Sequence, residues 1–185
     1  MRMLGIDPGL ACTGWGIVEK QNHQLRHLAH GQIRTSTADA DHIRLQVIFD
    51  GLAQICKDHQ PSAAAIESVF MAKNAKSALK LGMARGVAMA AVSSAGLTLA
   101  EIAPRLAKKA VTGTGSADKK QMQAMVSHLL SVTPKGADAA DALGLAIAGI
   151  HDAANGALLD KRQGSQETGL AAAISAALAK EAQKG

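Results

Sequence analysis

Four carboxylates interrupt the apolar segments of this chain, and they constrain its fold more than any other feature. Asp7 follows the run MLGI and precedes the turn-forming Pro8-Gly9, and Glu67 follows the run AAAI. Both segments therefore have the pattern of strands that end on a charge. If the two strands lie side by side in a sheet, their C-terminal ends place both carboxylates at one edge.

The other two carboxylates, Asp138 and Asp141, lie in the alanine-rich segment ADAADAL. A spacing of three residues puts both on one face of a helix, about one turn apart. A charge that is buried without a partner costs several kcal/mol. Hard oxygen ligands, with no His or Cys expected nearby, favour Mg²⁺ or Mn²⁺ over zinc. We therefore expect Asp7, Glu67, Asp138 and Asp141 to bind a divalent metal.

Each carboxylate, taken alone, has a simpler explanation. Asp7 could cap the turn at Pro8-Gly9, and Glu67 could be an exposed charge at a strand end. Asp138 could be a helix N-cap beside a solvated Asp141. A shared metal site explains all four positions at once. Two ions held by these carboxylates would activate a water molecule for in-line attack on a phosphodiester and stabilise the leaving oxygen.

The hydrophobic pattern predicts an α/β fold. Three strand-like segments with short polar links indicate an antiparallel meander, and the later segments alternate between helical and strand-like patterns. We expect strands at about residues 2–7, 13–20, 25–34, 63–66 and 97–102, and helices at 41–58, 74–95, 116–130 and 138–154. Ser116 is the expected N-cap of the third helix. This order predicts a five-stranded mixed sheet flanked by helices.

Length and composition limit the class of protein. We expect one domain over residues 1–154 and a tail at 155–185 that is a marginal helix or disordered. No apolar stretch reaches about 18 residues and the N-terminus lacks a signal-peptide pattern, so neither a membrane span nor export is expected. Cys12 and Cys56 are too few for a disulfide framework and are expected to be reduced. These features predict a cytoplasmic protein.

Positive charge is concentrated in the middle of the chain. Residues 71–120 contain nine Lys or Arg residues against Glu101 and Asp118, whereas the rest of the chain is slightly acidic. A charge run of this kind can be a solvated lysine face. Next to acidic metal ligands, however, it suits a polyanion whose phosphates must approach carboxylates. Together the two features favour a nucleic-acid substrate.

Five motifs resemble one known family. They are GIDPG (5–9), TGWG (13–16), AIESVFMAKNAKSALKLGMARGVA (65–88), TGTGSADK (112–119) and ADAADALGLAIA (137–148). In this order and spacing they resemble RuvC, the family of bacterial Holliday junction resolvases, from residue 1 to about 152. The resemblance implies a ribonuclease H-like nuclease domain at 1–154 and a crossover junction endodeoxyribonuclease. It would use Mg²⁺, two ions per subunit with Mn²⁺ as a substitute, to place paired symmetric nicks in four-way DNA junctions.

The resemblance also assigns roles to residues outside the carboxylate set. Lys108 and Lys119 match family lysines that face the scissile strand and would stabilise charge on the phosphate, although any exposed lysine has the same appearance in a sequence. Phe70 lies just after Glu67 and could stack on an unpaired base, or it could be a core residue beneath the loop. The remaining DNA contacts are expected from Lys73, Lys76, Lys80, Arg85, Lys109 and Lys120.

Symmetry and the resemblance together predict partners. A four-way junction has two-fold symmetry and one chain offers one metal site, so symmetric cutting requires a homodimer. Small residues on the helix at 74–95 (Ala78, Gly82, Ala84, Ala88, Ala91) suggest an interface there, although burial against the sheet explains part of the pattern equally well. The resemblance adds RuvA and RuvB as partners.

Two other functions remain open from the sequence. The chain could be a different ribonuclease H-like nuclease that acts on an RNA-DNA hybrid or processes RNA, which the long 65–88 motif disfavours. It could also be a module that binds DNA without cutting it, which the intact carboxylates disfavour. Cleavage of a junction and of a hybrid distinguishes these functions.

Overall fold

The computed structural model describes residues 1–68, 74–154 and 156. The chain divides after His151 into two units, Met1–His151 and Asp152–Gly185. The first unit contains all five strands of the described residues and every predicted site residue that the structure describes. The tail predicted at 155–185 lies outside the described residues except for Gly156, and so do Phe70 and Lys73.

The sheet of the first unit has the strand order β3-β2-β1-β4-β5. The strands are β1 (Arg2–Asp7), β2 (Cys12–Gln21), β3 (Gln24–Arg34), β4 (Ala63–Glu67) and β5 (Thr98–Ile102). β1, β2 and β3 form the expected antiparallel meander, and β1, β4 and β5 run parallel. β1 is therefore the central strand, where the two halves of the mixed sheet meet. The predicted five-stranded mixed sheet is confirmed.

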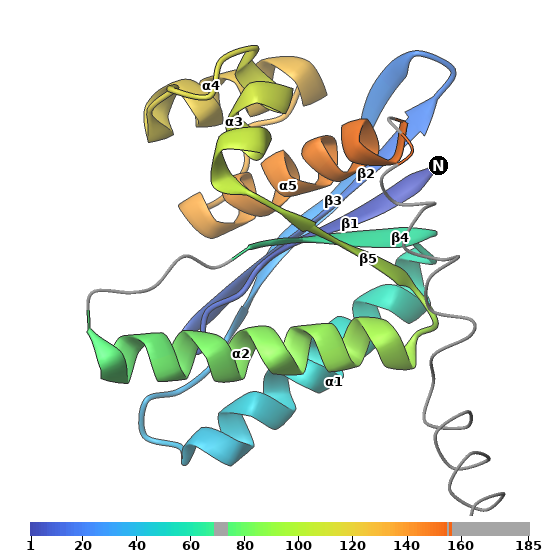
Figure 1. The fold of residues 1–185 in the computed structure, drawn as a ribbon. Helices are drawn as coiled ribbons and strands as arrows, with labels where there is room; N and C mark the ends of the chain where they lie inside the picture. The colour runs from blue at the N-terminus through green and yellow to red at the C-terminus, as the bar shows by residue number, and fades with distance from the viewer. Residues whose placement is uncertain (69–73, 155, 157–185) are drawn as a thin grey trace, which may run out of the picture. The chain divides into compact units, whose positions relative to one another are not determined.

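Two long helices cover one face of the sheet (Figure 1). They are α1 (Asp41–His59) and α2 (Ala75–Ser94). The apolar side of α1, including Ile48 and Leu52, is fully buried against Leu4 and Ile6 of β1. Burial of such apolar area supplies the main driving force for this layer.

The opposite face carries α5 (Ala137–Ala154), with α3 (Pro104–Thr112) and α4 (Lys119–Leu130) packed over it (Figure 1). α5 is buried on nearly all sides between residues 139 and 150, because the sheet lies beneath it and two helices lie above it. A helix in this position must be apolar all round, which explains the run ALGLAIAGI that follows Asp141.

Glycines in the strands let α5 approach the sheet closely. A Cβ atom on Gly5 would overlap the carbonyl oxygen of Ala142 and come within 2.6 Å of the Ala146 nitrogen. A Cβ atom on Gly16 would come within 2.6 Å of the Leu143 side chain. The helix backbone therefore lies directly on the backbone of β1, and also on that of β2, where a Cβ atom on Gly14 would come within 2.1 Å of the Asp138 carbonyl oxygen.

The structure corrects two parts of the sequence-based assignment. A nine-residue helix, α3, begins at Pro104 directly after β5, where no helix was expected. The third predicted helix begins at Lys119 rather than near Ser116, because the side chain of Asp118 accepts a hydrogen bond from the Gln121 N–H. Gln121 returns a bond to the Asp118 N–H, which completes a capping box. None of the helices in the described ranges could cross a membrane.

Candidate active site

Asp7 and Glu67 are brought together by the pairing of their strands. β1 and β4 run parallel with Ile6 opposite Ile66, so the next residue on each strand emerges at the same edge of the sheet. The turn that follows Asp7 is closed by Thr13, whose buried hydroxyl donates to the Gly9 carbonyl at 2.9 Å. The predicted convergence of the two carboxylates is therefore present.

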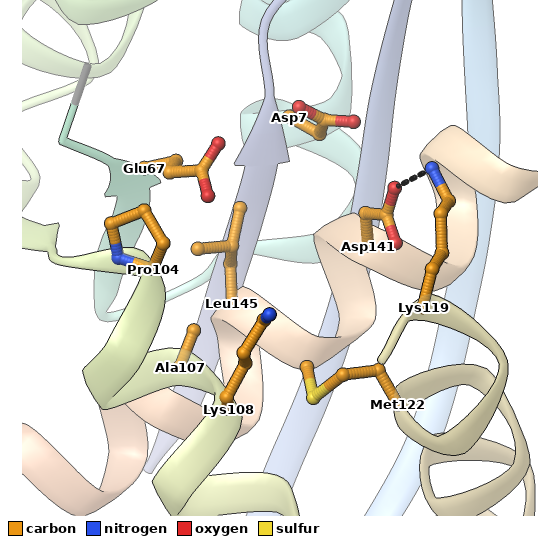
Figure 2. A pocket seen from close by; sticks show the side chains of 9 residues that line it. All are labelled: Asp7, Glu67, Pro104, Ala107, Lys108, Lys119, Met122, Asp141 and Leu145. Carbon is orange, nitrogen blue, oxygen red and sulfur yellow. Dashed lines mark hydrogen bonds and ion pairs between the residues drawn. The ribbon is translucent and has the colours of Figure 1, made fainter. Parts of the chain in front are cut away.

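α5 brings Asp141 to the same place. Asp7, Glu67 and Asp141 line one pocket, together with Lys108 from α3 and Lys119 from α4 (Figure 2). Its apolar walls come from Pro104, Ala107, Met122 and Leu145. Figure 2 shows the Glu67 carboxylate directed toward Asp7 and the Lys119 ammonium bonded to Asp141. Three carboxylates and two lysines, each from a different helix or strand, thus face one pocket.

The protonation behaviour of the acids reflects their crowding. Burial, followed by repulsion from Asp141, Glu67 and Asp138, raises the pKa of Asp7 to about 7. Burial and repulsion from Asp141 likewise raise the pKa of Glu67, while the nearby Lys119 ammonium opposes both shifts. Additional positive charge nearby would favour the ionised form of these carboxylates.

Lys119 supplies part of that charge. Its Nζ donates to Asp141 Oδ2 at 2.8 Å, and this hydrogen bond is the main reason that the pKa of Lys119 is raised. Lys119 is also the first residue of α4, where a cation opposes the helix dipole. The position is unfavourable for the helix itself, so its explanation lies in the contact with Asp141.

Asp138 is held differently from the other three carboxylates. It does not line the pocket, and its Oδ2 accepts hydrogen bonds from Gln32 Nε2 at 2.9 Å and from Cys12 Sγ at 3.0 Å. Burial and the bond to Asp138 raise the pKa of the Cys12 thiol to about 11, which keeps it a donor. Repulsion between Asp138 and Asp7 still places Asp138 within electrostatic reach of the site.

The donor set fits a hard divalent cation. The four acids offer carboxylate oxygens, the ligands that Mg²⁺ and Mn²⁺ prefer, and the raised pKa values of Asp7 and Glu67 indicate a need for added positive charge. Within the described residues, no three Asp, Glu, His or Cys side chains form a cluster compact enough to enclose an ion.

The remaining basic residues lie in varied environments. Lys109 of α3 and Lys120 of α4 are exposed, and Lys76 is exposed at the start of α2. Lys80 forms an ion pair with Asp41 of α1 at 3.8 Å. The contacts of these four lysines with DNA stay predictions.

Arg85 has partners within the protein. Its guanidinium pairs with Glu101 of β5 and donates to the main-chain oxygen of Glu67 at 3.3 Å. The side chain thereby joins the ends of β4 and β5. Its predicted contact with DNA is not tested by this arrangement.

A family model for "Crossover junction endodeoxyribonuclease RuvC" matches residues 3–149. The crossover junction endodeoxyribonuclease RuvC of Zymomonas mobilis is 52% identical over 152 residues, which cover 82% of this chain and 91% of that protein. The protein of the same name from Vibrio campbellii is 53% identical over 146 residues, 78% of this chain and 84% of that protein. This chain belongs to the RuvC family.

A solved RuvC structure has the same fold. The Thermus thermophilus RuvC in complex with a Holliday junction substrate superposes with a TM-score of 0.80 at 30% identity, covering 84% of this chain and 96% of that chain. The predictions of a RuvC-type nuclease, which hydrolyses phosphodiester bonds, and of a ribonuclease H-like fold are confirmed. RuvC nucleases are metal-dependent, and the chemistry of the donor set here agrees with that dependence.

Two residues of the site were missed from the sequence. Cys12 was interpreted only as a reduced side chain, and Gln32 was given no role, yet both contact Asp138. Neither has a local signal, because their proximity to Asp138 depends on contacts between residues more than 100 positions apart. The expectation that no Cys lies near the carboxylates was wrong for this reason.

Proposed function

We propose that this chain resolves four-way DNA junctions by metal-dependent hydrolysis, with paired symmetric nicks placed by two copies of the chain. The observation that carries the proposal is the pocket in which Asp7, Glu67 and Asp141 face Lys108 and Lys119. Acids that hold metal ions and lysines that attract phosphate both promote phosphodiester hydrolysis. Family membership narrows the substrate to junction DNA.

Asp7, Glu67, Asp138 and Asp141 would hold two Mg²⁺ ions, with Mn²⁺ as a substitute. When bound, such ions supply an activated water and stabilise the leaving oxygen. Asp7 is the candidate for the shared ligand, because the charges of Asp141, Glu67 and Asp138 all act on it. Its raised pKa means that a cation and a proton would compete for the same carboxylate.

Lys108 and Lys119 would stabilise the charge that develops on the scissile phosphate. Both side chains line the pocket, and they reach it from two different helices. The charge on the phosphate oxygens exceeds its ground-state value in the transition state, so lysines aimed at those oxygens accelerate the reaction more than they tighten binding.

The basic middle of the chain would bind the arms of the junction. Lys76, Lys80, Arg85, Lys109 and Lys120 are the contributing residues within the described ranges. Phe70 and Lys73, outside those ranges, would act at the branch point, where Phe70 stacks on an unpaired base. Neutralisation of phosphates by these side chains predicts binding that weakens steeply with salt.

The dimer would form through the exposed side of α2. Ala84, Ala88 and Ala91 are fully buried in the core that α2 shares with α1 and the sheet, so they are unavailable to a partner chain. Leu79 is 66% exposed, and a Cβ atom on Gly82 would meet nothing within 4 Å. Gly82, one of the residues predicted from the sequence, and Leu79, one turn away on the same open face, therefore make up the proposed interface.

Two further elements of the proposal concern the setting. RuvA and RuvB are proposed as partner proteins that bind the junction and move its branch point. The proposed location is the cytoplasm, where a bacterial chromosome recombines and is repaired.

The deciding experiment incubates the pure protein with an end-labelled four-way junction, with and without Mg²⁺. We expect paired cuts at symmetric positions on two opposing strands, only with the metal. A linear duplex and an RNA-DNA hybrid of the same sequence are the controls. Preferred cutting of the hybrid would favour a different ribonuclease H-like activity, and tight junction binding without any cutting would indicate a binding module.

A further inference from the structure

We propose that Gln32 and Cys12 are positioning residues that fix the Asp138 carboxylate for metal binding. The inference rests on the proposed function, since it concerns an acid of the same site. It adds residues of β2 and β3, two strands that carry none of the four carboxylates and neither of the two pocket lysines.

Both residues bond to the same oxygen atom. Gln32 Nε2 donates to Asp138 Oδ2 at 2.9 Å, and Cys12 Sγ donates to it at 3.0 Å. Among the hydrogen bonds of the described residues, none reaches the other oxygen, Oδ1. One oxygen is therefore occupied by protein donors, and the second is left to coordinate a cation.

The Gln32 amide is itself held in one orientation. Arg34 donates to Gln32 Oε1 at 2.7 Å, which directs the Nε2 donors toward Asp138. Gly136, in the loop before α5, lies against the same amide. A Cβ atom at Gly136 would come within 2.6 Å of Gln32 Nε2, and the residue has φ +95°. Arg34, Gln32 and Asp138 thus form a chain of bonds that only a glycine at position 136 accommodates.

Strand pairing explains why the two donors converge. Cys12 begins β2 and pairs with Arg34 of β3, and Gln32 pairs with Gly14 two residues further along β2. A Cβ atom on Gly14 would come within 2.9 Å of the Asp138 Cβ atom. The start of α5 therefore sits on this corner of the sheet, with a donor on each of two adjacent strands.

The chemistry of these donors differs from that at Asp141. Asp141 is paired with the Lys119 ammonium at 2.8 Å, so part of its charge is already neutralised. Asp138 receives two neutral donors, which orient the carboxylate and leave its charge available to a metal. Partners of this kind fix ligand geometry, and their loss typically costs 10- to 100-fold in metal affinity.

The test measures Mn²⁺ binding to the DNA-free protein by electron paramagnetic resonance. Gln32→Met removes the amide at similar length, and we expect Mn²⁺ affinity to fall by about tenfold. Cys12→Ala should weaken binding less, and Cys12→Ser should restore it because a hydroxyl keeps the donor. Gln21→Met is the matched control, since Gln21 Nε2 also bonds to a carboxylate, Glu19 Oε2 at 2.9 Å, on the exposed end of β2.

Cleavage provides a second readout. In Gln32→Met, the Mg²⁺ concentration for half-maximal junction cutting should rise by about tenfold, while the rate at excess Mg²⁺ stays close to that of the unmodified protein. A purely structural role would lower the metal-free melting temperature and leave Mn²⁺ affinity within twofold. That result, a gain in affinity, or no measurable Mn²⁺ binding by the unmodified protein would overturn the inference.

Two outcomes separate this inference from the proposed function. If the unmodified protein binds Mn²⁺ but cuts no junction, the proposed function fails and the role of Gln32 is still decided by affinity. If Gln32→Met does not fold, the Cys12→Ala and Cys12→Ser pair decides: equal affinities in the two variants refute the inference, and a loss confined to Cys12→Ala supports it.

Discussion

Lys119 of α4 donates a hydrogen bond to Asp141 of α5 at 2.8 Å, and this contact places a fixed cation beside the carboxylates. The Lys119 side chain is 61% exposed, and exposed ion pairs contribute little to stability. The value of the contact therefore lies in the electrostatics of the site. The Lys119 charge opposes the rise in pKa that burial causes at Asp7 and Glu67.

Replacing a pocket lysine should affect the reaction more than binding. For Lys119→Ala and Lys108→Ala, we expect single-turnover cleavage to slow by about 100-fold, with junction affinity reduced by less than about threefold. Quench-flow rates and gel-shift titrations measure the two quantities. Lys57→Ala, at the far end of α1, is the control for a simple loss of charge. Equal losses in rate and affinity would make both lysines plain phosphate contacts.

Asp7→Asn should abolish cleavage and preserve junction binding. The change removes a proposed metal ligand and one negative charge from the site, while the basic residues proposed to bind phosphates are unaltered. Cleavage assays and gel shifts at fixed salt test this expectation, with Asp50→Asn on the exposed side of α1 as the control. Undiminished cutting by Asp7→Asn would refute the assigned metal site.

The stability of the metal-free protein should depend on the protonation of Asp7. Its pKa is about 7 in the folded protein against an ordinary value of 3.8, so the folded state keeps a proton that the unfolded chain has released. The resulting stabilisation is fully present below about pH 4 and is lost as pH rises through 7.

Melting temperatures from pH 4 to 8 measure this effect. We expect a steeper decline in the unmodified protein than in Asp7→Asn, which has no such proton to lose. Excess Mg²⁺ should reduce the decline, because a cation replaces the proton at high pH. Parallel curves for the two proteins would contradict the assignment of this proton to Asp7.

Gly5→Ala should severely destabilise the fold. The new Cβ atom would overlap the Ala142 carbonyl oxygen, and neither backbone can move without separating α5 from β1. Gly144→Ala on the opposite side of α5 is the matched control, because its Cβ atom would meet Met122 Cε at an ordinary 3.4 Å. We expect Gly144→Ala to stay within about 1 kcal/mol of the unmodified protein. Chemical denaturation of both variants measures the difference.

Phe70→Ala should impair cutting of an intact junction and spare a junction that is already unpaired at its centre. If the ring holds a base out of its pair, it supplies unstacking energy on the order of a few kcal/mol, which a mismatched centre does not require. Cleavage rates on both substrates are compared with the melting temperature. A core Phe70 would lower stability by about 3 to 5 kcal/mol and slow both reactions alike. Equal rate losses at a normal melting temperature would argue against stacking.

The main parts of the site could be predicted because each acid carries a local signal. Asp7 and Glu67 follow short apolar strands, and Asp138 and Asp141 have helical spacing, so topology alone brings three of them into one pocket. Gln32 has no such signal. Its role depends on a register in β3 that follows a bulge near Ile17, and pairing irregularities of this kind are not visible in a single sequence.

The boundaries of short helices were harder to predict for a different reason. Ser116 and Asp118 are both good N-caps, and only the reciprocal bond with Gln121 decides between them. α3 has nine residues, too few for hydrophobic periodicity to stand out. The alanines of α2 were ambiguous because a small residue suits both a sheet face and a helix interface.

α5 packs directly on the glycines of β1 and β2, and this contact limits how the sequence of the enzyme can vary. The separation between Asp7 and the two acids of α5 is limited by main-chain atoms in contact. At Gly5 and Gly14, a larger side chain would force α5 and its acids away from the sheet. The spacing of the proposed metal ligands is therefore sensitive to substitution at positions where a hydrogen atom takes the place of a side chain.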